Sequence, residues 1–385
     1  LYPDHDDFAV RVAALPGIGL LGVTFGYVVA MDSPSGRALG EFHWGSTLWH
    51  ELAHVFTLEA TDHHVPRWLS EGISVFEEWR TGPTPGVAVP PDVVAALEAG
   101  KFLPVSELDS GFIRPSYPNQ VQVSYVQSGL VCLFIEQRWG FERLAALLHQ
   151  FDGKATTPVA IAATFKISPE EFDKEFNTFV RSRFGTLLAG MREFEERYQE
   201  ARKAMQAEQW SDVIEPAKRA AALYPEHVGP GSPNLLLARA FDKLGRRPEA
   251  IAAMETYRNA GGWDPDALRE LARWLDESGR GPDATAILET LNYADPLNAD
   301  QHAQLGERLL AGERAEESLR EFQALRSLRE HDQAQALFGS ARALRLLGDT
   351  AGSRRHVLDA LAVAPHYRPA QEFLLQIIEE RTKNE

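Results

Sequence analysis

The sequence has little cysteine, no long hydrophobic run and no excess of positive charge, and each absence excludes a class of protein. With one cysteine, Cys132, among 385 residues, neither a disulfide framework nor a cysteine-based zinc site can form within the chain. No uninterrupted apolar run of about eighteen residues is present, so we predict no transmembrane segment. The formal net charge of −16 argues against nucleic acid or anionic lipid as the main partner, since both require a basic surface.

The two halves of the chain differ in composition and in how regular their helical pattern is. The hydrophobic content of 44% is enough to bury a core. Up to Phe184-Gly185 the sequence is irregular, rich in aromatic residues and interrupted by Pro and Gly. Beyond that point it is an almost continuous helical pattern of Ala, Leu, Arg and Glu. We therefore predict two domains, residues 1–187 and residues 188–385.

The second half repeats at a spacing of about 34 residues. Helix-breaking dipeptides mark this spacing at Leu244-Gly245, Ser278-Gly279, Ala311-Gly312 and Leu347-Gly348. An Ala follows each dipeptide by a few positions and a Pro closes several units, as expected where a small residue lets two helices approach. We predict helix–turn–helix units from Tyr198 to Pro365, and a final helix over Pro369–Thr382 that caps the array.

The first half indicates mixed α and β structure. Gly22 to Met31 is β-branched and aromatic, which favours a strand. Cap residues and apolar periodicity predict helices from Ser46 or Thr47 to Glu59, from Val65-Pro66 to Arg80, and over Asp92–Ala99, Gln120–Trp139, Phe141–Phe151 and Pro169–Phe184.

The first predicted helix contains the motif His50-Glu51-Leu52-Ala53-His54. Residues four apart lie on the same face of a helix, one turn apart. Two imidazoles so placed can occupy two corners of a tetrahedral zinc site, with the intervening Glu beside the water that completes it. The other faces of the helix are apolar, and burying these polar groups without a partner would be costly.

A second motif follows on the next predicted helix. The segment Arg67-Trp68-Leu69-Ser70-Glu71-Gly72 places Glu71 seventeen residues after His54, a distance at which a helix–loop–helix hairpin can return the carboxylate to the same metal. HExxH followed by WLSEG resembles the gluzincin peptidases. Within that group the chain is most similar, over about Leu1 to Arg183, to bacterial peptidase-MA-like domains fused to tetratricopeptide repeats, and the 34-residue units resemble such repeats.

This resemblance implies an α+β zincin-like catalytic domain followed by an all-α tetratricopeptide-type solenoid. It implies one Zn²⁺ per chain, bound by His50, His54 and Glu71, with Glu51 as the general base. The loop between the two motif helices also offers two rival third ligands, His63 and His64.

Further side chains complete the expected site. In related gluzincins a Tyr from a later helix stabilises the oxyanion; Tyr125 matches by context, and Tyr117 is the second choice. Either Glu77 or Glu78, one to two turns after Glu71, could orient a ligating imidazole.

The sequence departs from other zinc peptidases at several positions, and these departures limit the kinds of peptidase activity that we expect. No G-x-M-E-N-type segment is present, so nothing supports N-terminal trimming, and endopeptidase action is the default expectation. Thr57 and Ala60 stand where metzincins have Gly and the third His, and Leu58 replaces the Asp of thermolysin-like enzymes. We therefore expect a different set of residues around the ligands.

Two functions fit these observations. The first is zinc-dependent hydrolysis of a peptide or protein that pairs with the strand at Gly22–Met31, with the repeats recruiting the substrate or a protein partner. The alternative is a tetratricopeptide-based interaction scaffold with an inactive or latent peptidase-like module. The intact Glu51 favours the enzyme, because a structural zinc site would not need it and would be closed by four protein ligands.

Overall fold

The computed structural model describes residues 1–13, 21–328 and 333–384. The chain forms two compact units, Leu1–Trp274 and Leu275–Glu385, each considered by itself. Within the described ranges, none of the helices combines the length and the apolar character that a membrane span requires.

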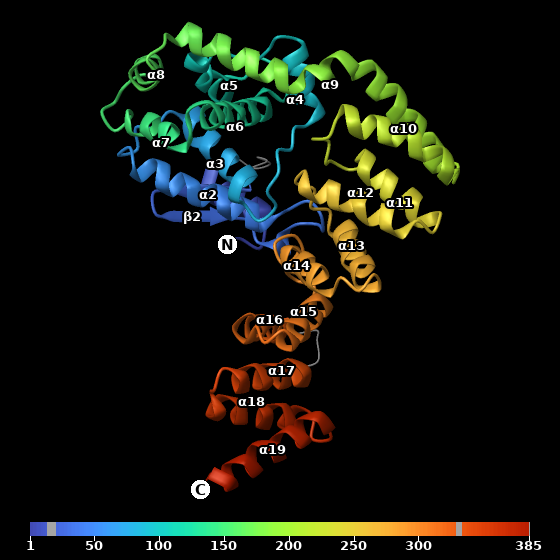
Figure 1. Ribbon diagram of the computed structural model, residues 1–385. Coiled ribbons are helices and arrows are strands. Elements are labelled where there is room, and N and C mark those ends of the chain that lie inside the picture. The colour runs from blue at the N-terminus through green and yellow to red at the C-terminus, as the bar shows by residue number, and fades with distance from the viewer. Residues whose placement is uncertain (14–20, 329–332, 385) are drawn as a thin grey trace. The chain divides into compact units, whose positions relative to one another are not determined.

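The elements of the first unit include helix α3, which packs against both α2 and α6 (Figure 1). In chain order they are α1 (His5–Ala13), β1 (Gly22–Phe25), β2 (Val28–Met31), the short 3₁₀ helix η1 (Pro34–Gly36), α2 (Trp44–Glu59), α3 (Arg67–Thr81), α4 (Pro91–Glu98), the 3₁₀ helix η2 (Val105–Glu107), α5 (Asp109–Ile113), α6 (Gln120–Trp139), α7 (Phe141–His149), α8 (Thr157–Phe165), α9 (Pro169–Gln206), α10 (Trp210–Leu223), α11 (Pro233–Lys243), α12 (Arg247–Asn259) and α13 (Pro265–Glu277), which crosses into the second unit.

The contact between α3 and α6 depends on two glycines. A Cβ added at Gly72 would lie 2.7 Å from the carbonyl oxygen of Ser128, and one added at Gly129 would lie 2.7 Å from a methyl of Val75. Both distances are shorter than van der Waals contact, so these positions admit no side chain without movement of the helices. The Gly of the WLSEG motif thus lets α3 pack directly on the long buried α6.

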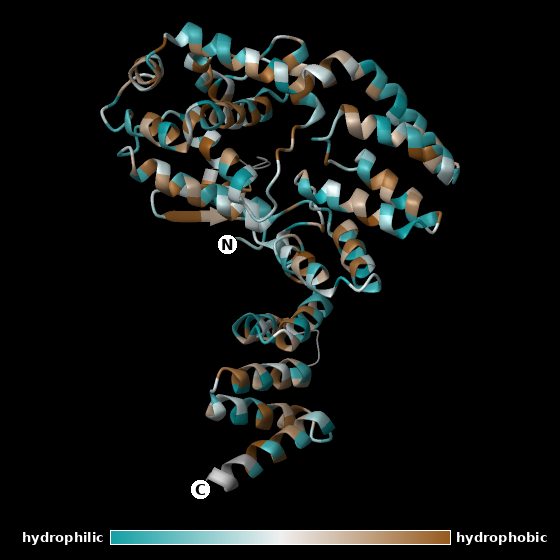
Figure 2. Ribbon diagram, viewed as in Figure 1, coloured by the Kyte–Doolittle hydropathy of each residue, from teal (hydrophilic) through white to brown (hydrophobic). Residues whose placement is uncertain are grey.

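The β structure is smaller than expected. In the part of the chain that is described, the only sheet is the antiparallel hairpin of β1 and β2, paired from Gly22↔Met31 to Phe25↔Val28. The single strand predicted over Gly22–Met31 is therefore wrong. Gly26, with φ of +58°, starts a two-residue turn between its halves. The described residues do not confirm the α+β zincin-like fold, although β2 is strongly apolar (Figure 2).

The N-terminus of the HExxH helix differs from the prediction. α2 begins at Trp44 rather than after Ser46 or Thr47. His43 caps it, because its Nδ1 accepts a hydrogen bond from the backbone N–H of Ser46 at 3.0 Å. An imidazole nitrogen thus takes the role that a hydroxyl oxygen was expected to fill.

The helix predicted to end at Phe184 continues as α9 to Gln206. Leu187 and Phe194 continue the buried face that Phe184 carries, so the helix has no reason to stop at Gly185. The predicted junction at 187/188 therefore falls inside a continuous helix. Helices α1, α5 and α8 were not predicted.

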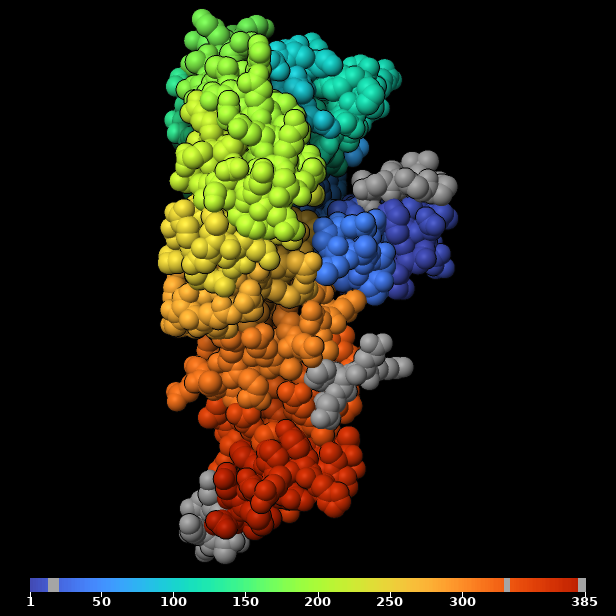
Figure 3. Space-filling model, turned by 90° about the vertical axis from the view of Figure 1, so that its right-hand side faces the viewer, coloured from blue at the N-terminus to red at the C-terminus, as the bar shows by residue number. Residues whose placement is uncertain are grey.

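The core of the first unit extends into the first repeat helices. Phe194 and Tyr224 belong to the same buried cluster as Trp68, and the Tyr224 hydroxyl donates a hydrogen bond to the carbonyl oxygen of Val89 at 2.5 Å. The ring of Trp263, before α13, lies 5.3 Å from that of His43. In Figure 3 the blue N-terminal segments lie against the yellow surface of these helices.

The second unit is a stack of helices in which neighbours along the chain pack on one another (Figure 1). They are α14 (Gly281–Leu291), α15 (Ala299–Ala311), α16 (Ala315–Ser327), α17 (Gln333–Leu346), α18 (Thr350–Val363) and α19 (Arg368–Asn384). Apolar and polar residues alternate along these helices in Figure 2, as expected for helices that bury one face.

All four helix-breaking dipeptides predicted from the repeat lie at turns between helices. Gly245, Gly279 and Gly348 have φ of +71°, +76° and +82°, the left-handed conformation that ends a helix. At the remaining turn Gly312 is not left-handed, and Glu313 takes φ of +59° instead. The final helix is also present, as α19.

Candidate metal centre

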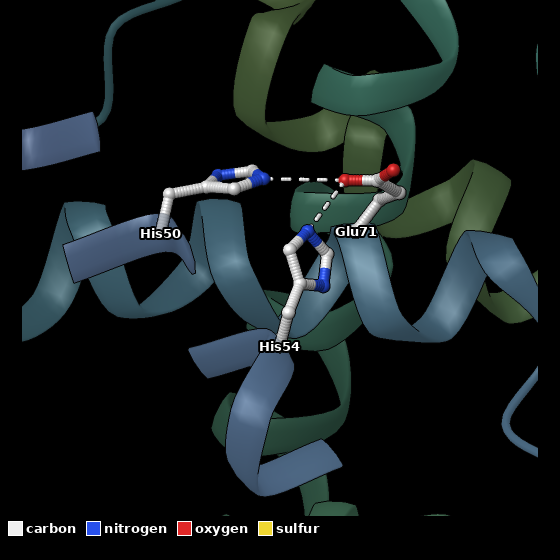
Figure 4. A group of neighbouring side chains, drawn as sticks. All are labelled: His50, His54 and Glu71. Carbon is white, nitrogen blue, oxygen red and sulfur yellow. Dashed lines mark hydrogen bonds and ion pairs between the residues drawn. The ribbon is translucent and has the colours of Figure 1, made fainter. Parts of the chain in front are cut away.

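Two imidazoles and one carboxylate converge between α2 and α3. His50 and His54 project from successive turns of α2, and Glu71 reaches them from α3 (Figure 4). The Nε2 atoms of His50 and His54 lie 3.2 and 3.1 Å from the same oxygen, Oε2 of Glu71. One possible ligand atom from each residue falls within 4.8 Å of the others, a spacing that a single metal ion can bridge.

The outer nitrogen of each imidazole has its own partner. His50 Nδ1 donates a hydrogen bond to Oε1 of Glu78 at 2.7 Å. His54 Nδ1 lies 2.8 Å from Oγ of Ser70 and 3.4 Å from Oγ of Ser74. Because both Nδ1 atoms are engaged from outside, both rings present Nε2 to the centre.

The charges in this group are strongly coupled. Burial lowers the pKa of His50, but its hydrogen bonds with Glu71 and Glu78 outweigh burial and raise the pKa to about 10. Burial would raise the pKa of Glu71, yet the two imidazoles beside it hold that pKa well below its usual range. Without a metal, the carboxylate is therefore neutralised by protonated imidazole.

Glu51 lies under the hairpin. It is buried, and its Oε2 accepts a hydrogen bond from Oγ1 of Thr24 at 2.6 Å. A Cβ added at Gly22 would lie 2.7 Å from Oε1 of Glu51, so β1 passes directly over this carboxylate. Gly22, Thr24 and Glu51 line the same cleft as the three convergent residues, with a volume of about 330 Å³.

Tyr125 approaches Glu71 from α6. Its hydroxyl donates to Oε1 of Glu71 at 3.3 Å, and its ring centre lies 6.1 Å from that of His50. Burial and the negative charge of Glu71 raise the pKa of Tyr125, so the hydroxyl stays protonated. Arg67 Nε also donates to Oε1 of Glu71 at 3.3 Å, which leaves Oε2 facing the imidazoles.

The alternatives considered for the site lie elsewhere. His63 is exposed in the loop after α2, and the His64 ring bonds the carbonyl of Thr61, so neither joins the convergent group. Tyr117 packs against Lys101 at 4.7 Å and does not line the cleft. Glu77 bonds Arg80 and Thr81, whereas Glu78 contacts a candidate ligand.

Sequence reasoning missed the polar residues that surround the ligands. Thr57 follows His54 by three residues on the same helix face, and this spacing could have identified it. Arg67 precedes Glu71 by four residues on α3, so its spacing carried the same kind of signal. Ser70 and Thr24 carried none, because their roles depend on where α3 and β1 cross α2. Cys132 is buried in α6.

Residues 34–182 match the sequence model of the Peptidase MA superfamily, a range that contains all the candidate site residues on α2, α3 and α6. This match confirms the predicted resemblance to peptidase-MA domains. No curated protein matches the chain.

Solved structures resemble the helical repeats. YrrB, described as a tetratricopeptide repeat protein with an unusual peptide-binding site, aligns with 46% of this chain and 89% of its own, at 14% identity and a TM-score of 0.34. The MamA protein aligns with 44% of this chain and 91% of its own, at 14% identity and a TM-score of 0.32. These likenesses are weak, and the repeat assignment rests on the chain's own helix pairs and turn glycines.

Proposed function

We propose that the Peptidase MA superfamily domain at residues 34–182 is a gluzincin-type zinc metallopeptidase that acts as an endopeptidase. The observation that carries this proposal is the approach of two Nε2 atoms, from His50 and His54, to within 3.2 and 3.1 Å of one Glu71 oxygen. Two nitrogens and one carboxylate oxygen are a common ligand set of catalytic zinc sites, which keep a fourth position for water or substrate.

The residues present fit this metal. Both rings turn Nε2 inward, and Glu71 presents one oxygen while Arg67 and Tyr125 bind the other. When bound, Zn²⁺ would polarise the scissile carbonyl and lower the pKa of a water molecule. The chain itself supplies the proton transfers and the orientation of the substrate.

Glu51 is assigned the proton transfers. Its carboxylate follows His50 directly, and Thr24 holds it on the wall of the cleft. In this position it accepts a proton from the attacking water and later delivers one to the leaving amine. Tyr125, a protonated donor in the same cleft, is assigned to stabilise the negative charge that develops on the carbonyl oxygen.

The hairpin supplies an edge for an extended peptide. Phe25 and Val28 form the pair that flanks the two-residue turn, and the backbone N–H of Asp32 donates a hydrogen bond to the carbonyl oxygen of Leu21. In an antiparallel pair, hydrogen bonds to the partner strand come from every second residue. The backbone N–H and C=O groups of residues 21, 23 and 25 therefore face β2. The backbone N–H and C=O groups of Gly22 and Thr24 are therefore directed away from β2. Both residues line the cleft, where a substrate strand could add to β1.

The test is the substitution Glu51→Gln, which keeps the shape of the side chain but removes the base. We expect one zinc per chain as in the unsubstituted protein, and cleavage of labelled casein reduced at least about 100-fold. Glu77→Gln serves as the matched control, because that carboxylate binds Arg80 and Thr81 outside the site, and it should cleave normally.

Cleavage that survives in Glu51→Gln would refute the assigned role of Glu51. Zinc bound without any cleavage in the unsubstituted chain would favour the interaction scaffold with a latent peptidase-like module.

Among the described residues, His50, His54 and Glu71 are the one metal-ligand group of this kind. We accordingly assign the helical array to binding of substrate or partner rather than to chemistry.

A further inference from the structure

A chain of buried hydroxyl groups runs behind His54. Oγ of Ser70 lies 2.8 Å from His54 Nδ1, and Oγ1 of Thr57 lies 2.9 Å from Oγ of Ser70. Thr57 in turn donates to the carbonyl oxygen of His54 at 3.2 Å. Thr57 is 1% exposed and Ser70 is 7% exposed, so water does not replace these partners.

One arrangement of protons satisfies every contact in this chain. A hydroxyl has one proton to donate. Thr57 donates to the carbonyl oxygen of His54 and Ser70 donates to Thr57, which leaves the lone pairs of Ser70 to accept from Nδ1 of His54. In this arrangement the ring carries its proton on Nδ1, and the lone pair of Nε2 is available to a metal.

We infer that Ser70 and Thr57 act as positioning residues, a hydroxyl relay that fixes the tautomer and the orientation of His54 for metal binding. This inference rests on the metal site proposed above and adds to it the residues that prepare one ligand. A carboxylate, Glu78, performs the equivalent task for His50, so the two imidazoles are held by chemically different partners.

The relay also accounts for the positions of Ser70 and Thr57 in the sequence. Ser70 precedes Glu71 on α3, so one helix supplies both the third candidate ligand and the partner of the second. Thr57 stands one turn beyond His54 and closes the chain back on the His54 carbonyl. Ser74, at 3.4 Å from Nδ1, is too distant for more than a weak bond.

The experiment measures zinc affinity by competition with a chelator in the full chain, for Ser70→Ala, Thr57→Val and the double variant. Loss of an outer partner of a ligating imidazole typically weakens metal binding by about 10 to 100-fold. We expect about a tenfold loss for Ser70→Ala and a smaller loss for Thr57→Val. The double variant should match Ser70→Ala, because both changes break the same chain.

Two further variants separate this effect from general loss of packing. Thr57→Ser keeps the hydroxyl and should retain normal zinc affinity. Thr61→Val removes a buried hydroxyl one turn along, which bonds the carbonyl of Thr57 and the N–H of Val65 rather than a ligand. It should lower the melting temperature of the metal-free protein without changing zinc affinity.

The outcomes separate the two proposals. Unchanged zinc affinity in Ser70→Ala, or losses that add in the double variant, would overturn the relay while leaving the metal site intact. Absence of zinc from the unsubstituted chain would overturn the proposed metal site and the relay together. Weakened binding in both single variants, no further loss in the double variant and rescue by Thr57→Ser would establish the relay.

Discussion

At the scale of single residues, His50 holds a proton that a metal must displace. Its two nitrogens lie against Glu71 and Glu78, and these hydrogen bonds raise its pKa to about 10 against an ordinary value of about 6.5. A ligating imidazole must be neutral at the nitrogen that binds the metal. At the proposed site, zinc and this proton would therefore compete for the same Nε2.

This competition predicts that zinc affinity rises with pH. Below pH of about 10 the metal-free ring is protonated, so the apparent affinity should increase about tenfold per pH unit. The measurement is chelator competition near pH 6.5, 7.5 and 8.5, corrected for protonation of the chelator. Glu78→Gln removes one of the groups that raise the pKa of His50. In this variant the zinc affinity should stop increasing at a lower pH than in the unsubstituted chain. An affinity independent of pH in this range would contradict the prediction.

At the scale of elements, the start of the HExxH helix depends on an uncharged His43. Burial lowers the pKa of His43 to about 4, and its Nδ1 must be unprotonated to accept from the N–H of Ser46. Because the folded pKa lies below the unfolded value of about 6.5, this group contributes stability that is complete above pH 6.5 and is lost as pH falls towards 4.

We expect His43→Ala to lower the free energy of unfolding by about 1 kcal/mol at neutral pH, the usual cost of a lost N-cap. His43→Asn, which can cap without titrating, should lose less stability than the unsubstituted chain between pH 7.5 and 5. Urea unfolding with chelator present at the two pH values measures both effects. An identical loss in the unsubstituted chain and in His43→Asn would show that His43 is not the titrating group.

At the scale of the whole molecule, the residues that hold the candidate site share a core with the first repeat helices. Phe194, Leu223 and Tyr224 lie in the same buried cluster as Trp68 of α3. Trp263 contacts His43, the cap of α2. The first compact unit accordingly extends to Trp274.

We therefore predict that a fragment of residues 1–187 does not fold, whereas residues 1–280 form a protease-resistant unit that binds one zinc. The shorter fragment ends within α9 and exposes the apolar surface that Phe194, Leu223 and Tyr224 cover. Burial of each large apolar side chain contributes about 1.5–3 kcal/mol to the free energy of unfolding. Limited proteolysis and zinc analysis of both fragments measure this. A stable, zinc-binding fragment of residues 1–187 would contradict it and support the division predicted from sequence texture.

The amino-acid sequence by itself determined what depends on local periodicity. The four-residue spacing of His50 and His54 places both rings on one face of a helix, and Glu71 on the next helix was identified as the third convergent group. Three of the four turn glycines, Gly245, Gly279 and Gly348, end their helices in the left-handed conformation that glycine adopts readily, a property of the residue type. Helix α6 was predicted with the bounds that the structure shows.

Tertiary structure alone decided which side chains meet across elements. Ser70 contacts His54 only because α3 crosses α2 at that turn, and Thr24 contacts Glu51 only because β1 passes over α2 at that point. The continuation of α9 beyond Phe184 likewise depends on partners from α10 that bury its face. The physical reason is that the sequence sets which residues share a face of one helix, whereas hydrogen-bond partners depend on how closely and at what position two helices pack.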